Sequence, residues 1–482
     1  MYKRLYIVIF ASIFLAAILL RYWDYSRRYG IGADGSRDAI VSFEARRQMQ
    51  LPLTGSFSSI GPITFGPWYY YYLTLSDFII PSIWAPWMAV GLASVFMVLV
   101  MYKIGKYLEG KWFGLLLASL ATFSPAQISA STLLQQHALI GFLSSLAIFL
   151  LIKIISAKKY TKLSLLWGLV IGIAMNIHFQ AVTLLTLPIL LFIFSKKRSF
   201  IVHFLIGIFI SMVPILIFEL NNHWFNSRHI IDYIFIGQYR VWTSNRWLTF
   251  IGKFFPEFWS FVIGTVPVVS LLIMLSFAIL ITNNFFRKKI SFAFIIICLS
   301  FFIQLVMLRY YRGEKFFGYL QFFHPYIFIF TGYVIWTILR KIDKPIITKI
   351  CLVIFICLIL PNRLKYLSAD KFNLETRARF DTLKKFYPQE RFAIYECNKV
   401  YDRERNQALV LFLAMHKLYD ERGVKISIFN PACENKNSKH LSGDLADINN
   451  VSSDQFANSG FTLLSPHIIF NDTARWWFKE QP

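Results

Sequence analysis

Two carboxylates and an arginine stand together in the stretch Gly32-Ala33-Asp34-Gly35-Ser36-Arg37-Asp38-Ala39. Asp34 and Asp38 are four residues apart, so in a helix they fall on nearly the same face. Two carboxylates placed in this way can serve as a general base and as ligands of a divalent metal ion, Mg²⁺ or Mn²⁺. One of them can instead cap the helix. The spacing alone leaves both interpretations open.

Other polar residues interrupt apolar stretches later in the chain. They are His178 with Gln180, Gln135-Gln136-His137, and His324 before Pro325. Ionisable groups within a membrane are functional by default, although these lie near the ends of apolar segments, where water can reach them. Tyr69 and Tyr70 belong to the turn Gly66-Pro67-Trp68-Tyr69-Tyr70. Their rings can anchor the chain at a membrane interface or stack on a sugar.

The composition indicates a membrane protein. Of the 482 residues, 56% are hydrophobic and 16% are charged, whereas a soluble chain carries about 25% charged residues. The net charge of +24 would also suit a nucleic-acid-binding protein. However, the basic residues of the first 361 positions stand in short clusters between long apolar runs, so we expect no nucleic-acid partner.

The apolar runs predict an all-α polytopic membrane domain in residues 1–361, with about eleven spans. We place them at 5–22, 83–104, 113–133, 138–155, 163–178, 179–195, 200–220, 259–282, 290–308, 324–339 and 346–361. Alternate loops hold 15 Lys and 4 Arg against two acidic residues, which predicts that they are cytoplasmic. The N-terminus is then cytoplasmic in a plasma or inner membrane. The opposite loops hold 11 Arg and 2 Lys, and arginine suits bidentate binding of phosphate, although it also snorkels at interfaces.

The first external loop, about residues 24–82, carries the acidic motif. Residues 38–49 show helical spacing of apolar side chains, which predicts a helix along the membrane surface. We expect one face of this helix to lie toward lipid or the bundle, formed by Ala39, Ile40, Phe43 and Met49. We expect the other face to lie toward water, formed by Glu44, Arg46 and Arg47.

Residues 362–482 lose the apolar runs and predict a small α/β domain on the extracytoplasmic face. The pattern indicates a strand at 391–396, a helix at 405–422, a strand at 424–429 and a late strand near 461–470. No catalytic motif stands in this segment. The domain can bind an acceptor or cover the external cavity.

The order of these features resembles the GT-C glycosyltransferases, which include protein mannosyltransferases and lipid A aminoarabinose transferases. Their Asp-Glu motif, often followed by Arg-Tyr-Ala, matches Asp34 and Arg37, and their later Pro-Pro-Leu-aromatic turn matches residues 66–70. Gly35 stands where the family usually has Glu, so Asp38 is the candidate for the second carboxylate. The resemblance is clear over residues 1–200 and rests on topology beyond them.

The resemblance implies transfer of a hexose or pentose from an undecaprenyl or dolichyl phosphate carrier to a lipid, glycan or protein acceptor on the extracytoplasmic face. Asp34 would act as general base in an inverting displacement. The departing phosphate needs cations, for which Arg309, Arg312 and Lys315 are candidates beside Arg37. Tyr69, Tyr70, His178 and His324 complete the expected substrate-binding set.

Two other classes of protein share this composition. A flippase or transporter of lipid-linked oligosaccharides would also have many spans, but such proteins show internal repeats and charged mid-membrane helices that this sequence lacks. An O-antigen ligase or polymerase would concentrate its functional residues in a large late loop. The acidic motif in the first loop favours the glycosyltransferase.

Overall fold

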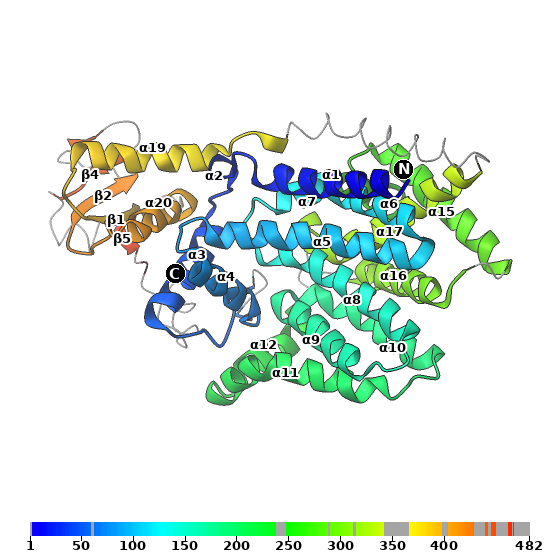
Figure 1. Cartoon of the computed structure of the whole chain (residues 1–482). Coiled ribbons are helices and arrows are strands. Elements are labelled where there is room, and N and C mark those ends of the chain that lie inside the picture. Colours follow the sequence, from blue (N-terminus) through cyan, green and yellow to red (C-terminus); the bar gives the residue numbers. More distant parts are fainter. Residues whose placement is uncertain are drawn as a thin grey trace.

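The computed structural model describes residues 2–58, 62–237, 247–287, 290–311, 315–341, 366–397, 403–428, 439–441, 445–449, 461–464 and 466. A helical bundle makes up most of the molecule, and a small domain with a mixed sheet lies at one end of it (Figure 1). The N-terminus lies at the opposite end. The helices α3 and α4 lie between the bundle and the small domain.

The first half of the bundle begins with the helix that carries the N-terminus. Its elements are α1 (Tyr2–Tyr22), α2 (Tyr25–Arg28), α3 (Ala33–Gln48), α4 (Trp68–Ile79), α5 (Ala85–Glu109), α6 (Lys111–Thr122), α7 (Pro125–Ala130), η1 (Gln136–Leu139), α8 (Ile140–Ser156), α9 (Thr161–Ile177), η2 (Phe179–Leu185) and α10 (Thr186–Phe194). The second half comprises α11 (Phe200–Asn221), α12 (Phe225–Phe235), α13 (Trp247–Thr249), η4 (Phe250–Phe254), α14 (Phe255–Ile263), α15 (Pro267–Phe286), α16 (Phe292–Tyr310), η5 (Phe317–Phe323) and α17 (His324–Arg340).

Six helical segments of the described chain are long and apolar enough to cross a membrane, which makes this an integral membrane protein. They are Ala85–Glu109, Gln136–Ser156, Phe200–Asn221, Pro267–Phe286, Phe292–Tyr310 and Phe317–Arg340. Four shorter apolar helices accompany them, at Tyr6–Tyr22, Lys111–Thr122, Thr161–Ile177 and Phe179–Phe194. The last predicted span, 346–361, lies outside the described residues, so the count of eleven stays a prediction.

Two predicted spans are each divided in the structure. The segment 113–133 breaks after α6, because the hydroxyl of Ser124 accepts a hydrogen bond from the backbone of Gln127 and Pro125 begins α7. The segment 259–282 breaks at Gly264, whose φ of 74° ends α14, and Pro267 begins α15. Capping and turn residues therefore determine where these helices end, although the sequence on both sides of each break is apolar.

Small residues bring the helices of the bundle into close contact. A Cβ added at Gly168 of α9 would lie 1.9 Å from the carbonyl oxygen of Phe204 in α11. A Cβ at Gly105 of α5 would lie 2.7 Å from the Cα of Gly114 in α6. Such close backbone approach is how helices pack in lipid, where the hydrophobic effect gives little drive for association.

The small domain contains α19 (Lys371–Phe386), β1 (Phe392–Cys397), α20 (Arg403–Met415), β2 (Val424–Ile428), β3 (Lys439–His440), β4 (Leu445–Asp447) and β5 (Phe461–Leu464). The strand order is β3-β4-β2-β1-β5, with β1 parallel to β2 and the other pairs antiparallel. The β-α-β order expected from the sequence is present. The helix ends earlier than predicted, at Met415, and Lys417 then takes a φ of 59°.

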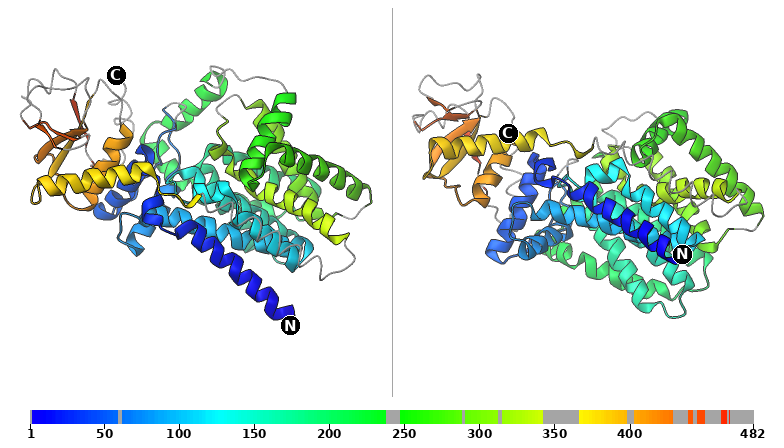
Figure 2. Two further views of the ribbon diagram at one scale, coloured as in Figure 1. Left: turned by 90° about the horizontal axis from the view of Figure 1, so that it is seen from above. Right: turned by 45° about the horizontal axis from the view of Figure 1, so that its top comes forward.

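The small domain is fixed to the loop between α1 and α3. The side-chain amide of Asn373 donates to the carbonyl oxygens of Ser26 and Tyr29, at 2.9 and 3.2 Å. The Arg377 guanidinium lies 4.9 Å from the centre of the Trp84 ring. Two further views show the domain projecting from the end of the bundle away from the N-terminus (Figure 2). It therefore covers the same end that carries the acidic motif.

The acidic helix differs from the prediction in its start and in its orientation. It begins at Ala33, not near Asp38, so Asp34 lies in its first turn. Glu44, predicted to face water, is buried and pairs with the half-exposed Arg47 at 2.6 Å. The reason is that α3 packs between α4 and α20, so its surroundings are protein on both sides.

Candidate functional site

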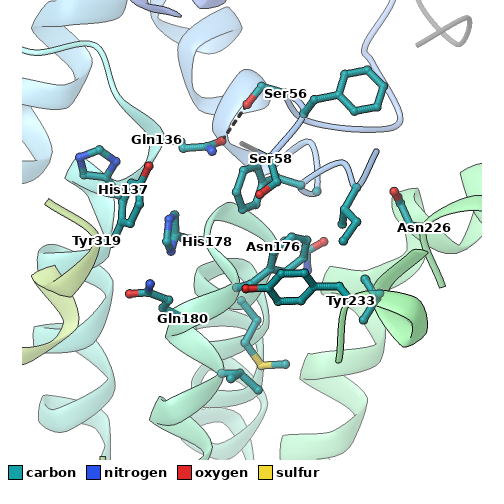
Figure 3. A pocket seen from close by; sticks show the side chains of 18 of the residues that line it. Ser56, Ser58, Gln136, His137, Asn176, His178, Gln180, Asn226, Tyr233 and Tyr319 are labelled. Atoms are coloured by element: carbon teal, nitrogen blue, oxygen red, sulfur yellow. Dashed lines mark hydrogen bonds between the residues drawn. The ribbon is translucent and has the colours of Figure 1, made fainter. Parts of the chain in front are cut away.

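A cavity of about 1250 Å³ lies at the end of the bundle beside the acidic helix. Its walls come from α3, the loop before α4, η1, the junction of α9 with η2, and parts of α11, α12, α16 and η5. Gln407 of α20 adds one wall residue from the small domain. Figure 3 shows polar side chains from several of these elements around one space. The cavity brings together Asp34, Arg37, Asp38 and His178.

Asp34 is the exposed member of the acidic motif. Its side chain is 74% exposed, and one oxygen accepts a hydrogen bond from Arg37 at 2.9 Å. Gly32 stands at the N-cap of α3, where no side chain bonds to the helix. The capping interpretation is therefore wrong for this end of the helix. The carboxylate remains open to the cavity and gains from the positive end of the helix dipole.

Gly35 packs closely against neighbouring elements. A Cβ at this position would lie 3.3 Å from the Cβ of Leu134 and 3.6 Å from the ring of Trp87. A side chain at this position would therefore require Leu134 to give way slightly. Asp38, one turn further along α3, lines the cavity.

Arg37 joins the two carboxylates. Its guanidinium bonds to Asp34 at 2.9 Å and to a single oxygen of Asp38 at 2.9 and 3.0 Å. The Arg37 side chain is 22% exposed and that of Asp38 only 3%. Charge-assisted bonds of this kind are about twice as strong as neutral ones. The motif therefore forms one fixed unit of two carboxylates around a cation.

Asp38 is held from a second side by Tyr70, whose hydroxyl donates to the same oxygen at 2.8 Å. Burial raises the pKa of Asp38 to about 6, although the attraction of Arg37 and both hydrogen bonds oppose this rise. Tyr70 thus contacts the acidic motif through Asp38 and does not line the cavity. Tyr69 is also buried, its hydroxyl has no partner among the described residues, and neither tyrosine lines the cavity. The structure therefore buries both rings outside the lining of this cavity.

The raised pKa of Asp38 gives a prediction for stability against pH. Asp38 titrates near 3.8 when unfolded and near 6 when folded, so between these values the folded state binds more protons. Stability should therefore fall as pH rises from about 4 to about 6 and change little above that. Burial also raises the pKa of Asp77 to about 6 and adds the same trend. The thermal midpoint of Asp38→Asn, measured across this range, should show a shallower fall; a slope equal to that of the wild type would contradict the assignment.

The candidate cations of the late loop lie behind the cavity wall. Arg309 is buried, with its guanidinium 5.4 Å from the centre of the Trp247 ring. The Lys315 ammonium donates to the carbonyl of Tyr311 at 2.5 Å, and burial lowers the pKa of this lysine. Tyr310 and Tyr311 line the cavity, whereas Arg309 and Lys315 do not. Arg312 lies outside the described residues.

The two histidines predicted to bind substrate, His178 and His324, lie in different places relative to the cavity. His178 borders the cavity in extended backbone between α9 and η2. His324 lies deeper, where its Nδ1 is 2.6 Å from the amide nitrogen of Gln127, and it does not line the cavity. The first turn of α17 turns the His324 ring toward α7, an orientation that the sequence pattern does not reveal.

Sequence reasoning missed several cavity residues. Tyr319 comes from η5, and Asn176 is a lone amide in the apolar helix α9, which is a signal that could have been used. Asn226 and Glu219 are two more such residues. The Glu219 carboxylate accepts hydrogen bonds from the backbone nitrogens of Asn226 and Ser227 at the start of α12, at 2.9 and 3.0 Å. These two contacts span only seven and eight residues, across the turn between α11 and α12.

The residues of the motif do not fit a divalent metal bridging the two carboxylates. The Arg37 guanidinium already bonds to both carboxylates. Within the described part of the chain, no group of three or more His, Cys, Asp or Glu side chains could hold a metal ion. The cation that lies between the two carboxylates is the guanidinium of Arg37.

Solved membrane transferases share the fold. ArnT from Cupriavidus metallidurans in the apo state aligns with a TM-score of 0.60 at 10% identity, over 92% of this chain and 97% of ArnT. The same ArnT bound to undecaprenyl phosphate gives a TM-score of 0.57 at 13% identity, over 92% of this chain and 98% of ArnT.

A third structure extends the likeness to another type of transferase. The Archaeoglobus fulgidus oligosaccharyltransferase, solved with zinc and sulfate, gives a TM-score of 0.53 at 12% identity and covers 79% of this chain. This chain spans only 57% of that protein. No protein-family model and no curated protein sequence matches the chain. The chain therefore shares its fold with ArnT and with this oligosaccharyltransferase.

Proposed function

We propose that the protein is a membrane glycosyltransferase that moves a sugar from a polyprenyl phosphate carrier to an acceptor on the extracytoplasmic face. The observation that carries this proposal is an exposed carboxylate, Asp34, on the wall of a large cavity at the end of a membrane bundle. The GT-C fold and the undecaprenyl phosphate bound to ArnT support the same choice of donor.

The cavity has two chemically different regions, and this suits a lipid-linked sugar. One region is apolar and is formed by α9, α11, α12 and α16, with side chains such as Met175, Met212, Leu216, Ile230 and Met307. The other is polar and borders the acidic motif. An isoprenoid tail would occupy the apolar region, because against the polar wall it would leave hydrogen-bonding groups unsatisfied. Its phosphate would then lie between the two regions.

The reaction would be a direct displacement. The acceptor hydroxyl gives its proton to the Asp34 carboxylate as its oxygen forms a bond to the anomeric carbon. The electron pair of the bond between that carbon and the phosphate oxygen leaves with the polyprenyl phosphate. The anomeric configuration is thereby inverted. Arg37 fixes the base and supplies positive charge at the cavity wall, and Arg312 remains a candidate for the phosphate.

The motif predicts that transfer does not need a divalent cation. Because the Arg37 guanidinium bridges Asp34 and Asp38, treatment of the purified protein with EDTA should change the rate by less than about two-fold. The measurement is the rate of transfer before chelation, after it, and after addition of Mg²⁺, Mn²⁺ or Zn²⁺. Loss of activity that one of these ions restores would show that a metal displaces the guanidinium.

The small domain would cover the acceptor side of the site. Its helix α20 packs on α3, and Gln407 reaches the cavity wall. An acceptor that approaches from outside must therefore pass beside this helix.

The proposed function is tested with purified protein in lipid vesicles and a panel of polyprenyl monophosphate sugars. The proposal expects glycosylated acceptor and free polyprenyl phosphate from at least one donor. Movement of an intact donor across the bilayer, with no cleavage, would favour the flippase instead.

A further inference from the structure

One end of the cavity is lined by a group of uncharged hydrogen-bonding side chains, which we call the amide-imidazole cluster. Figure 3 shows its members on one side of the cavity, contributed by η1, the junction of α9 with η2, and η5: Gln136, His137, His178, Gln180 and Tyr319. The proposed transfer step assigns no role to these residues.

Aromatic contacts fix the rings of the cluster. The ring centres of His178 and Tyr319 are 4.9 Å apart, and those of His137 and Tyr319 are 5.3 Å apart. Phe65 stacks on His178, with ring centres 5.5 Å apart and planes at 20°. The imidazole positions are therefore set before any ligand enters, which lowers the entropic cost of binding.

Two polar atoms of the cluster are buried without a partner among the described residues. They are Nδ1 of His178 and Oε1 of Gln180. A buried polar atom that lacks a hydrogen bond costs free energy, so such atoms in a cavity wall indicate a ligand or ordered water. His178 itself is only 6% exposed. His178 and Gln180 both line the cavity, and these two atoms lie just beneath its surface.

The charged groups of the described cavity wall are already engaged. Arg37 pairs with Asp34 and Asp38. The Glu219 carboxylate accepts two backbone N–H groups. The described part of the wall therefore offers a sugar no unpaired cation for a carboxyl group. It offers an amine no carboxylate other than the proposed base.

We propose that the amide-imidazole cluster is the subsite for the donor's sugar and that it selects an uncharged sugar over an amino sugar or a uronic acid. This inference rests on the proposed function. Amides, imidazoles and a phenol both donate and accept hydrogen bonds, as sugar hydroxyls require. Asp34 and His137 line the same cavity. A sugar in the cluster would therefore share that space with the proposed base.

The test is equilibrium binding of short-chain prenyl phosphates to the full-length protein in lipid nanodiscs. The probes carry glucose, galactose, mannose, glucosamine, glucuronate or no sugar. We expect one neutral hexosyl probe to bind at least about ten-fold more tightly than the bare phosphate, and the charged sugars to gain nothing. His178→Phe keeps the ring stack and Gln180→Leu keeps the volume. Each should remove most of that gain and leave affinity for the bare phosphate unchanged.

Matched controls are His203→Phe on α11 and Gln389→Leu on the surface of the small domain, neither of which lines the cavity. Both should bind every probe as the wild type does. If His178→Phe and Gln180→Leu also behave as the wild type, or if a charged sugar binds most tightly, the subsite is overturned while the transferase proposal stands. If no prenyl phosphate binds at all, the proposed function fails together with the subsite.

Discussion

Replacing Asp34 with Asn should lower the rate of sugar transfer by about 10³-fold, which is within the range for loss of a general base. Asn keeps the size of the side chain but cannot accept the proton of the attacking hydroxyl. The donor would still bind, because the cavity wall and the apolar region are unchanged. The measurement is kcat and KM for transfer from the best donor, with the loss expected in kcat.

Asp24→Asn is the matched control for this prediction. Asp24 also precedes an arginine by three residues and pairs with Arg27 at 3.4 Å, but it stands at the N-cap of α2 and does not line the cavity. Its replacement should leave transfer within about two-fold of the wild type, since exposed pairs contribute about 0–1 kcal/mol. Full activity in Asp34→Asn would remove Asp34 from the mechanism.

Replacing Arg37 with Gln should both destabilise the protein and reduce transfer. Removal of one partner of a buried ion pair costs about 3–5 kcal/mol, because the other charge stays buried without compensation. Asp38 is 3% exposed and would keep only the bond from Tyr70. Without the guanidinium the two carboxylates repel, so one of them takes a proton more readily. We expect transfer to fall by about 10²-fold at neutral pH.

A conservative change separates charge from geometry at this position. Arg37→Lys keeps a cation but cannot bridge two carboxylates in the fork geometry of a guanidinium. It should recover part of the stability and little of the activity. Arg27→Gln is the control, because the Arg27 side chain is 55% exposed in its own pair. Thermal midpoints and transfer rates that do not distinguish Arg37→Gln from this control would contradict the bridging role.

The features that sequence reasoning predicted are those with local patterns. Apolar length predicts the spans, and the break near His178 follows from polar residues at the end of α9. The acidic motif is found by its spacing after the first span. These signals need only neighbours within a few turns, and they suffice to predict a helical membrane bundle with the acidic motif after its first helix.

The features that it missed depend on packing between distant elements. His324 points toward Gln127, which is 197 residues away in the sequence, whereas His137 and Tyr319 meet at the cavity. The helix α3 packs against α20, which is more than 350 residues further along the chain, as well as against α4. Spacing places a residue on a helix face, but the identity of the neighbour on that face is a tertiary property.

The most direct test of sugar transfer by direct displacement is a single turnover of the purified protein with one labelled polyprenyl phosphate sugar and its acceptor. Product analysis should find one free polyprenyl phosphate for each sugar transferred, and an anomeric configuration inverted relative to the donor. Release of the sugar with retained configuration, or recovery of the donor intact on the other leaflet, would contradict direct displacement by an acceptor that Asp34 activates.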